Sequence, residues 1–315
     1  MQKILITGAA GNIGSALVDR LLTYPEYRVV GVDNFLTGSR SKLPQAAGSN
    51  FTFIKADVNN YAEISSIMLS HGFQYVFHYA AVVGVQRTLD NPVLVLDDIQ
   101  GIKNILDLCK NTGVKRVFYS SSSEVYGEPV EFPQNEQTTP LNSRLPYAVV
   151  KNVGEAFLRS YHREYDLDYT IFRFFNTYGP RQSEDFVVTR FLKQAIAGMP
   201  ITIYGEGSQS RTFCYIDDNI DTTLRCLQND LCVNDVMNLG NDEEISIKDL
   251  ASLIVRITSS TSKVDFLPAL KEGDMTRRKP DNSRMRAILE RPLVSLEEGI
   301  RKTIEKGMFG ANPVS

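Results

Sequence analysis

The chain has 315 residues, of which 43% are hydrophobic, so it can bury the core of one large domain or of two closely joined ones. Its 34 basic and 37 acidic side chains are spread along the sequence and give a net charge of −3, so no basic stripe predicts a nucleic-acid partner. No run reaches the roughly 18 apolar residues of a membrane span. The 4 cysteines and 3 histidines lack the spacing of a disulfide framework or a zinc site. We therefore expect a cytoplasmic protein without metal, membrane contact or disulfides.

Short β-rich runs alternate with helical stretches through the first half of the chain. Strands are expected at residues 3–7, 28–32, 52–56, 75–79, 115–120 and 169–174. Helices with apolar residues at helical spacing are expected at residues 12–24, 91–112 and 146–165. This alternation predicts βαβ units, and therefore a parallel sheet with helices on both faces.

The pattern loosens beyond about residue 176, where Gly205, Gly207 and Pro280 mark loops among shorter elements. We expect an α/β fold with a Rossmann-type doubly wound parallel sheet over residues 1–175. Later strands of this sheet are expected from about residues 207–240. The remainder, mainly residues 176–315, is expected to form a smaller C-terminal lobe that binds the substrate.

A glycine-rich turn follows the first expected strand directly. Gly8 permits a tight turn, Gly11 lets backbone N–H groups approach a pyrophosphate, and Gly14 lets the next helix pack against the strand. The spacing is GxxGxxG and not the usual GxGxxG, so the glycines alone are weak evidence. With a strand before them and a helix after them they predict a dinucleotide site, in which Asn12 and Ile13 should also contact the cofactor.

Acidic residues end the next two expected strands. Asp33 is placed to accept hydrogen bonds from an adenosine ribose, with Asn34 beside it in the same site. No basic residue follows Asp33 before Arg40, which favours NAD over NADP. Asp57 and the adjacent Val58 could contact the adenine, although an aspartate at this position could equally cap a loop.

Tyr147 and Lys151 lie four residues apart on the helix expected at residues 146–165, so their side chains project from one face. An ammonium group there would lower the pKa of the tyrosine and favour its phenolate. The phenolate could then act as a general base toward a hydroxyl while hydride leaves the same carbon. A YxxxK pair is common by itself, and a solvated helix face is the alternative.

Clustered hydroxyls and one carboxylate end the strand expected at residues 115–120. The segment is residues 118–127, with the sequence FYSSSSEVYG. Ligands bind at the carboxyl ends of strands in a parallel sheet, so these side chains are candidates for a substrate site. A polar turn between strand and loop is the alternative.

Five segments together resemble the extended short-chain dehydrogenase/reductase family, in its branch of nucleotide-sugar epimerases, dehydratases and decarboxylases. They are residues 7–14 (TGAAGNIG), 78–81 (HYAA), 121–127 (SSSEVYG), 147–151 (YAVVK) and 173–181 (RFFNTYGPR). The resemblance implies an NAD-dependent enzyme that oxidises a nucleotide sugar, UDP-linked in many members, at C4 and reduces it again within one cycle. It also implies a homodimer, held by a four-helix bundle between subunits.

The resemblance implies roles for particular residues. The catalytic set would be Ser122, Glu124, Tyr147 and Lys151, with the Ser122 hydroxyl helping to polarise the sugar O4. Ala80 and Lys151 would also contact the cofactor. The expected substrate-binding residues are Ser123, Asn176, Arg181, Arg211 and Arg277.

Asn176 and Arg211 match positions that hold the nucleotide diphosphate in the resembled family. Alternatively, Asn176 could cap a loop and Arg211 could pair with Asp217 or Asp218. Arg277 lies in residues 272–281 (EGDMTRRKPD), whose cations could meet a uronate or the diphosphate.

Glu124 is the most informative residue for the choice of reaction. UDP-glucuronate decarboxylases and several dehydratases carry a carboxylate there, whereas simple 4-epimerases usually lack one. Ser123 stands where dehydratases of the dTDP-glucose type have an aspartate, which argues against that class. Residues 272–281 also resemble the decarboxylases.

Two departures favour epimerisation. The decarboxylases usually have threonine at Ser122, and residues 83–87 (VGVQR) resemble a UDP-glucose 4-epimerase type. We therefore expect a UDP-glucuronate decarboxylase that forms UDP-xylose. The alternative is a 4-epimerase acting on UDP-glucose, UDP-N-acetylglucosamine or UDP-glucuronate, and a non-catalytic NAD-binding protein is a more distant one.

Overall fold

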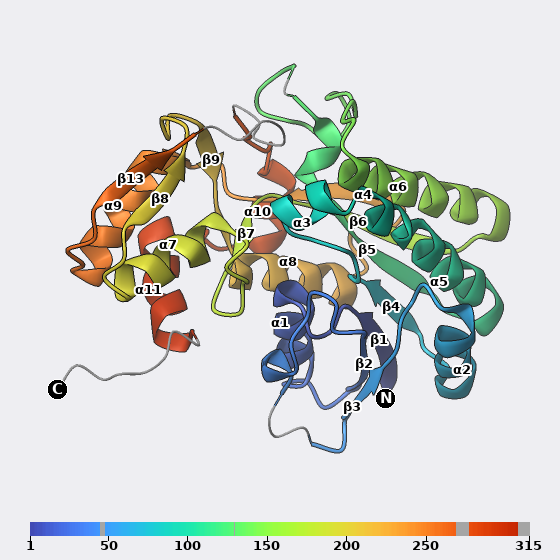
Figure 1. Ribbon diagram of the computed structural model, residues 1–315. Coiled ribbons are helices and arrows are strands. Elements are labelled where there is room, and N and C mark those ends of the chain that lie inside the picture. The colour runs from blue at the N-terminus through green and yellow to red at the C-terminus, as the bar shows by residue number, and fades with distance from the viewer. Residues whose placement is uncertain (45–47, 129, 269–276, 308–315) are drawn as a thin grey trace.

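Seven parallel strands form the central sheet of the computed structural model, which describes residues 1–44, 48–128, 130–268 and 277–307 (Figure 1). The strands lie in the order β3–β2–β1–β4–β5–β6–β11. Their bounds are β1 (Gln2–Thr7), β2 (Tyr27–Asp33), β3 (Phe51–Lys55), β4 (Tyr75–His78), β5 (Arg116–Ser122), β6 (Asp168–Phe174) and β11 (Asp235–Leu239). The strand order reverses between β1 and β4, which confirms the doubly wound fold predicted from the sequence.

Both faces of this sheet are apolar because successive side chains of a strand point to opposite faces. Ile4 and Ile6 of β1 pack in one core cluster with Leu17 of α1 (Asn12–Leu21). Leu5 lies in the cluster on the other face, with Ile64 of α2 (Tyr61–His71) and Ile102 of α5 (Asp98–Thr112). Burial on both faces explains why the central strands are continuously apolar and do not alternate.

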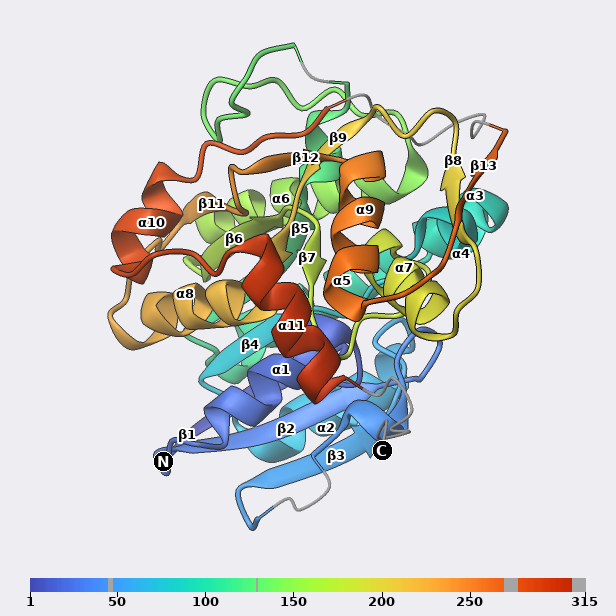
Figure 2. The same ribbon diagram turned by 90° about the vertical axis from the view of Figure 1, so that its left-hand side faces the viewer.

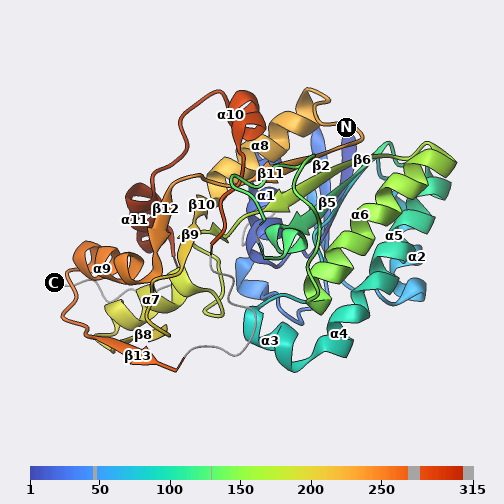
Figure 3. The same ribbon diagram turned by 90° about the horizontal axis from the view of Figure 1, so that it is seen from above.

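The helices divide between the two faces (Figure 3). α2, α5 and α6 (Pro146–Tyr165) cover one face, and α1 and α8 (Ile216–Gln228) cover the other. The shorter helices around this sheet are η1 (Arg40–Lys42), α3 (Val85–Asp90), α4 (Pro92–Leu96) and η2 (Ser123–Tyr126). Within the described ranges, no helix combines the length and the apolar content that crossing a bilayer requires.

The expected elements are present, with shifted ends. α1 ends at Leu21 and not at residue 24, because Pro25 follows and disfavours a continuing helix. The helix expected at residues 91–112 is divided at Asp97 into α4 and α5. At the start of α5, the Asp98 carboxylate turns inward and accepts a hydrogen bond from the Val82 N–H at 2.7 Å.

A smaller lobe lies beside the sheet, at the left in Figure 1 and facing the viewer in Figure 2. Its paired strands are β7 (Thr177–Tyr178) with β10 (Cys214–Tyr215), β8 (Ile201–Tyr204) with β13 (Val264–Leu267), and β9 (Ser210–Thr212) with β12 (Glu244–Ser246). Its helices are α7 (Val187–Ile196), α9 (Ile247–Thr258) and α11 (Leu296–Lys306), while α10 (Ser283–Leu289) packs on α8 and β11. Between these segments the chain returns to the large sheet as β11.

A buried ion pair joins the large sheet to α6. Arg173 of β6 is 1% exposed, and its Nε and Nη2 donate to Glu155 Oε1 and Oε2 at 2.8 and 2.7 Å. Ser121 of β5 donates to the same carboxylate at 2.7 Å, and Arg173 Nη1 donates to the Tyr126 hydroxyl of η2 at 2.8 Å. Four elements are thereby tied together at the carboxyl end of the sheet.

Glu155→Gln should lower the free energy of unfolding by about 3–5 kcal/mol, because it leaves the buried Arg173 charge without a counter-charge. Urea denaturation would measure the change. Arg159→Ala is the matched control, since Arg159 contacts the same carboxylate at 3.0 Å from a partly exposed position. Removing that partner should cost about 1 kcal/mol or less. Equal losses in the two variants would contradict the importance of the Arg173–Glu155 pair.

Candidate active site

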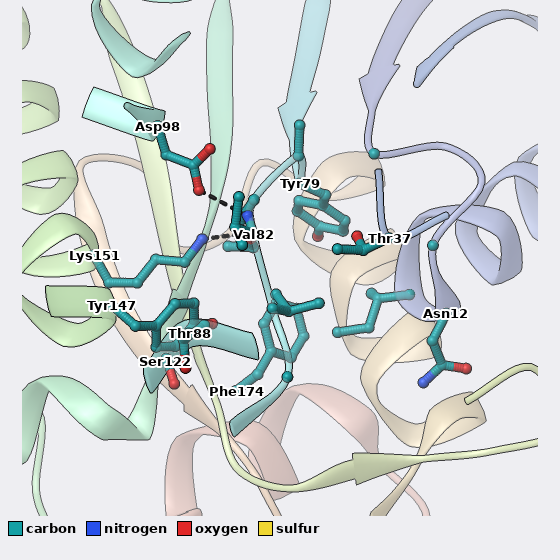
Figure 4. Close-up of a pocket in the computed structure, with 18 of the residues that line it drawn as sticks. Asn12, Thr37, Tyr79, Val82, Thr88, Asp98, Ser122, Tyr147, Lys151 and Phe174 are labelled. Carbon is teal, nitrogen blue, oxygen red and sulfur yellow. Dashed lines mark hydrogen bonds between the residues drawn. The ribbon is translucent and has the colours of Figure 1, made fainter. Parts of the chain in front are cut away.

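A pocket opens at the carboxyl ends of the central strands (Figure 4). Its walls come from the β1–α1 turn, the loops after β2, β3 and β4, the end of β5, the start of α6 and residues of the smaller lobe. The crevice at the point where strand order reverses is where ligands bind in doubly wound sheets. Most of the expected site residues line this pocket, and Arg181, Arg211 and Arg277 are not among the lining residues.

The glycine turn leaves no room for side chains. Gly8 has φ +70°, and a Cβ on it would lie 2.7 Å from the Ala80 N. A Cβ on Gly14 would lie 2.1 Å from the Gly8 carbonyl oxygen, and one on Gly11 would lie 3.1 Å from the same atom. The backbone therefore lies open toward the pocket at the N-terminus of α1, where a pyrophosphate fits. Ala80 itself lines the pocket.

Asn12 and Ile13, the first residues of α1, also line the pocket. The side-chain oxygen of Asn12 is buried and has no hydrogen-bond partner among the described residues, so it is available to a ligand. Together with the glycine turn, these residues fit a bound dinucleotide.

Asp33 at the end of β2 and Asp57 after β3 both lie on the pocket wall. Asp33 accepts hydrogen bonds from the Ala10 N–H at 2.9 Å and the Phe35 N–H at 2.7 Å, so it shapes the turn as well as facing the pocket. Asn34 donates to Asp57 Oδ2 at 3.1 Å, and both line the pocket with Val58. Asp57 Oδ1 also accepts from the Asn59 N–H at 2.9 Å, so the loop-capping contact considered for Asp57 is present.

Tyr147, Lys151 and Ser122 point into the same part of the pocket (Figure 4). Tyr147 lies in the first turn of α6, and Lys151 one turn later has its Nζ 5.7 Å from the centre of the tyrosine ring. The Lys151 ammonium donates to Ser120 Oγ at 3.3 Å. Ser122, the last residue of β5, forms a hydrogen bond with Tyr147 and accepts one from the Glu124 N–H at 3.2 Å.

Burial governs the charge of these groups. Burial raises the pKa of Tyr147 above its usual range, and the Glu124 carboxylate raises it further, whereas the Ser122 hydrogen bond lowers it. Burial also lowers the pKa of Lys151 to about 8. The expected lowering of the Tyr147 pKa is therefore wrong for the protein alone, because desolvation disfavours the phenolate.

Glu124 forms an ion pair inside the pocket. Its Oε1 lies 2.7 Å from Nη2 of Arg278, and both side chains line the pocket and are largely buried, at 18% and 7% exposure. The second oxygen of Glu124 is buried and has no hydrogen-bond partner among the described residues. Ser123, between Ser122 and Glu124, also lines the pocket.

The side chain that reaches the pocket from the RRKPD run is Arg278 and not Arg277. Arg277 is turned away by Glu244, to which its Nε and Nη2 donate at 2.6 and 2.7 Å, and it stacks on the Phe132 ring at 4.3 Å. The sequence contains both arginines, but nothing in it indicates which of the two neighbouring side chains faces the pocket. Residues 272–276 of the same stretch lie outside the described residues.

The other expected substrate contacts lie in different places. Asn176 lines the pocket with φ +35° and donates to the Thr212 carbonyl at 2.9 Å. Arg181 pairs with Asp19 of α1 at 2.5 Å. Arg211 is buried on β9 and donates to the Ser210 carbonyl.

Comparison with known proteins gives a consistent result. The model of the NAD dependent epimerase/dehydratase family matches residues 4–240. The chain is 35% identical to UDP-glucose 4-epimerase of Mycolicibacterium smegmatis, over 96% of this chain and 98% of that protein. It is also 35% identical to UDP-glucuronic acid decarboxylase 1 of Danio rerio, over 96% of this chain and 72% of that protein.

A solved structure shares the fold along almost the whole chain. The UDP-glucuronic acid 4-epimerase from Bacillus cereus, in complex with UDP-glucuronic acid and NAD, superimposes with a TM-score of 0.88 at 32% identity. The match covers 97% of this chain and 98% of that one.

Gly14→Ala should weaken NAD binding about tenfold or more, equivalent to about 1.4 kcal/mol. An alanine inside a helix usually stabilises by about 1 kcal/mol, but here its methyl group would lie 2.1 Å from the Gly8 carbonyl oxygen and force the turn open. Isothermal titration with NAD measures the effect. Gly72→Ala, after α2, is the control: nothing lies within 4 Å of the added methyl group, and although φ +63° strains that local turn, the variant should bind NAD normally. Unchanged affinity in Gly14→Ala would show that the turn does not hold the cofactor.

Proposed function

The chain belongs to the NAD-dependent epimerase/dehydratase family, and we propose that it converts UDP-glucuronate to UDP-xylose and carbon dioxide through a transient 4-keto sugar. NAD is its cofactor. The proposed catalytic residues are Tyr147, Lys151, Ser122 and Glu124, together with Arg278.

The Glu124–Arg278 pair carries this proposal. It places a guanidinium inside the pocket near Tyr147, close enough for both partners to affect the pKa of that tyrosine. Guanidinium groups bind carboxylates through two parallel hydrogen bonds. UDP-glucuronate brings a carboxylate on C5 into such a site, whereas UDP-glucose brings an uncharged hydroxymethyl group. A guanidinium at this position therefore favours the uronate over the uncharged sugar.

The glycine turn, Asp33 and Lys151 would hold NAD, which would supply the acceptor and later the donor of the C4 hydride. Tyr147 takes the O4 proton as the hydride leaves, and the Ser122 hydroxyl donates a hydrogen bond to O4. The phenolate of Tyr147 is favoured by the nearby Lys151 ammonium, against the effect of burial. Tyr147 thus takes up the O4 proton, and Ser122 keeps O4 in place for that transfer.

The 4-keto group makes the C5 carboxylate that of a β-keto acid. Its C5–C6 bond breaks, carbon dioxide leaves, and the electron pair moves to O4 as an enolate. Arg278 holds the carboxylate in place until the bond breaks, and Glu124 orients the guanidinium. C5 then takes a proton that originates in solvent, and Tyr147 returns its proton to O4 when C4 is reduced.

A 4-epimerase is the second candidate. The segment that resembles that enzyme type, residues 83–87, forms part of the pocket wall through Val83 and Gly84. Arg87 donates to the Val83 carbonyl at 2.7 Å and pairs with Asp185 of the opposite lobe at 3.2 Å. In an epimerase, this wall would face a 4-keto sugar that turns over before C4 is reduced.

Purified protein incubated with NAD and UDP-glucuronate in D₂O should form UDP-xylose with deuterium at C5, and should release carbon dioxide without net accumulation of NADH. Proton NMR of the anomeric and H5 signals, with trapping of the gas, measures both products. Tyr147→Phe should slow turnover about 10²–10⁴-fold, because the general base is lost.

UDP-galacturonate without carbon dioxide would instead identify a 4-epimerase. If UDP-glucuronate is unchanged, UDP-glucose and UDP-N-acetylglucosamine are the next substrates. Normal turnover by Tyr147→Phe would remove the catalytic assignment altogether.

We also propose a homodimer formed through the helical face that contains α4, α5 and α6. Large apolar side chains are exposed there, with Val93 at 72%, Leu96 at 41% and Val149 at 37% exposure. A second subunit would bury them.

Light scattering at micromolar concentration should therefore give twice the chain mass of 35.3 kDa. Val149→Lys should shift the mass toward that of one chain, because the lysine would be buried against the partner without a counter-charge. A mass of one chain for the unaltered protein would contradict the dimer.

A further inference from the structure

Asp98 is a buried carboxylate in the pocket that the proposed reaction does not use. It is the first residue of α5, is 8% exposed, and lines the pocket. Its Oδ2 accepts from the Val82 N–H at 2.7 Å, which fixes the carboxylate beside the loop after β4. Figure 4 shows the Asp98 side chain, with its hydrogen bond to Val82, and the Lys151 side chain in the same part of the pocket.

The other titratable groups that face Lys151 are neutral. His78 on β4 is buried with a pKa lowered to about 3, and its Nδ1 lies 2.9 Å from Thr7 Oγ1. Burial raises the pKa of Tyr119 on β5, whose ring centre lies 5.1 Å from Lys151 Nζ, and burial likewise raises that of Tyr147 on α6.

The neighbouring anions are engaged elsewhere. Glu155, one turn beyond Lys151 on α6, is paired with Arg173, and Glu124 is paired with Arg278. Among the described groups, Asp98 on α5 is the carboxylate whose charge favours the ammonium form of Lys151.

Lys151 itself is in a position that disfavours charge. It is 3% exposed, and burial lowers its pKa to about 8, while Asp98 acts in the opposite direction. In turn, burial raises the pKa of Asp98, and the Val82 N–H and the charge of Lys151 lower it. Each group thus favours the charged form of the other, as expected for opposite charges in a desolvated site.

We propose that Asp98 is a positioning residue, whose carboxylate, held by the Val82 N–H, keeps Lys151 in the ammonium form at neutral pH. The functional consequence rests on the role proposed above for Lys151 beside Tyr147. Asp98 does not touch the reacting sugar in this scheme. It acts through Lys151, and also steadies the loop after β4 that carries Ala80 at the cofactor site.

The test measures the titration of Lys151 directly in NAD-free protein. Lysines are dimethylated with ¹³C-formaldehyde, the Lys151 resonance is assigned by its absence in Lys151→Arg, and its chemical shift is followed against pH. The unaltered protein should titrate near pH 8. Asp98→Asn should titrate about one pH unit lower or more, because the amide can still accept from the Val82 N–H but carries no charge.

Asp97→Asn is the matched control. It removes the same charge from the adjacent, exposed residue at the start of the same helix. Its Lys151 resonance should titrate as in the unaltered protein. Asp98→Ser, which also offers an acceptor to the Val82 N–H, provides a second removal of the charge in case Asp98→Asn does not fold.

The pH profile of C4 oxidation gives a second readout. Its alkaline limb should move to lower pH in Asp98→Asn by the same amount as the Lys151 titration, which a merely structural role would not produce. Identical Lys151 titrations in Asp98→Asn and the unaltered protein would overturn the proposal. If no nucleotide sugar is turned over but the titration moves as expected, the proposed function fails while the inference about Asp98 stands.

Discussion

The buried pair of Arg173 and Glu155 sets the geometry on which the pocket depends. Glu155 lies four residues after Lys151 on α6, so its contact with β6 fixes the rotation of the helix that carries Tyr147 and Lys151. The same carboxylate holds Ser121, and Ser122 follows it directly. A buried ion pair contributes little net stability, because both charges must be desolvated. The Arg173–Glu155 pair instead fixes the position of α6 relative to β6.

A second ion pair connects distant parts of the chain within the pocket. Glu124 follows the fifth strand of the sheet, whereas Arg278 comes from the segment before α10. In the proposed reaction, hydride transfer at C4 uses groups from the sheet and α6, whereas the fate of the 4-keto sugar depends on the further groups that contact it. Those proposed here, Glu124 and Arg278, come from segments far apart in the sequence, so this part of the proposed chemistry depends on long-range packing.

Local patterns predicted much of this structure. Strand and helix periodicity located the first six strands, and the glycine spacing and the YxxxK pair located the two ends of the pocket, because each depends on residues close in sequence. The position of β11 beside β6, the choice of Arg278 over Arg277, and the inward turn of Asp98 rather than Asp97 depend on long-range packing. The raised pKa of Tyr147 could not be predicted from local patterns either, because desolvation is a property of the folded pocket.

The return of the chain to the large sheet as β11 also limits how the protein can be divided. Residues on both sides of β11 belong to the smaller lobe, and β11 pairs with β6 along its whole length. A fragment that ended after β6 would expose the backbone edge of Asp168–Phe174 and its apolar side chains, which is the kind of open edge that recruits strands from other molecules. The two lobes therefore have distinct contacts but cannot be separated as folding units. A lobe taken from a related protein could replace either one only together with part of the other lobe.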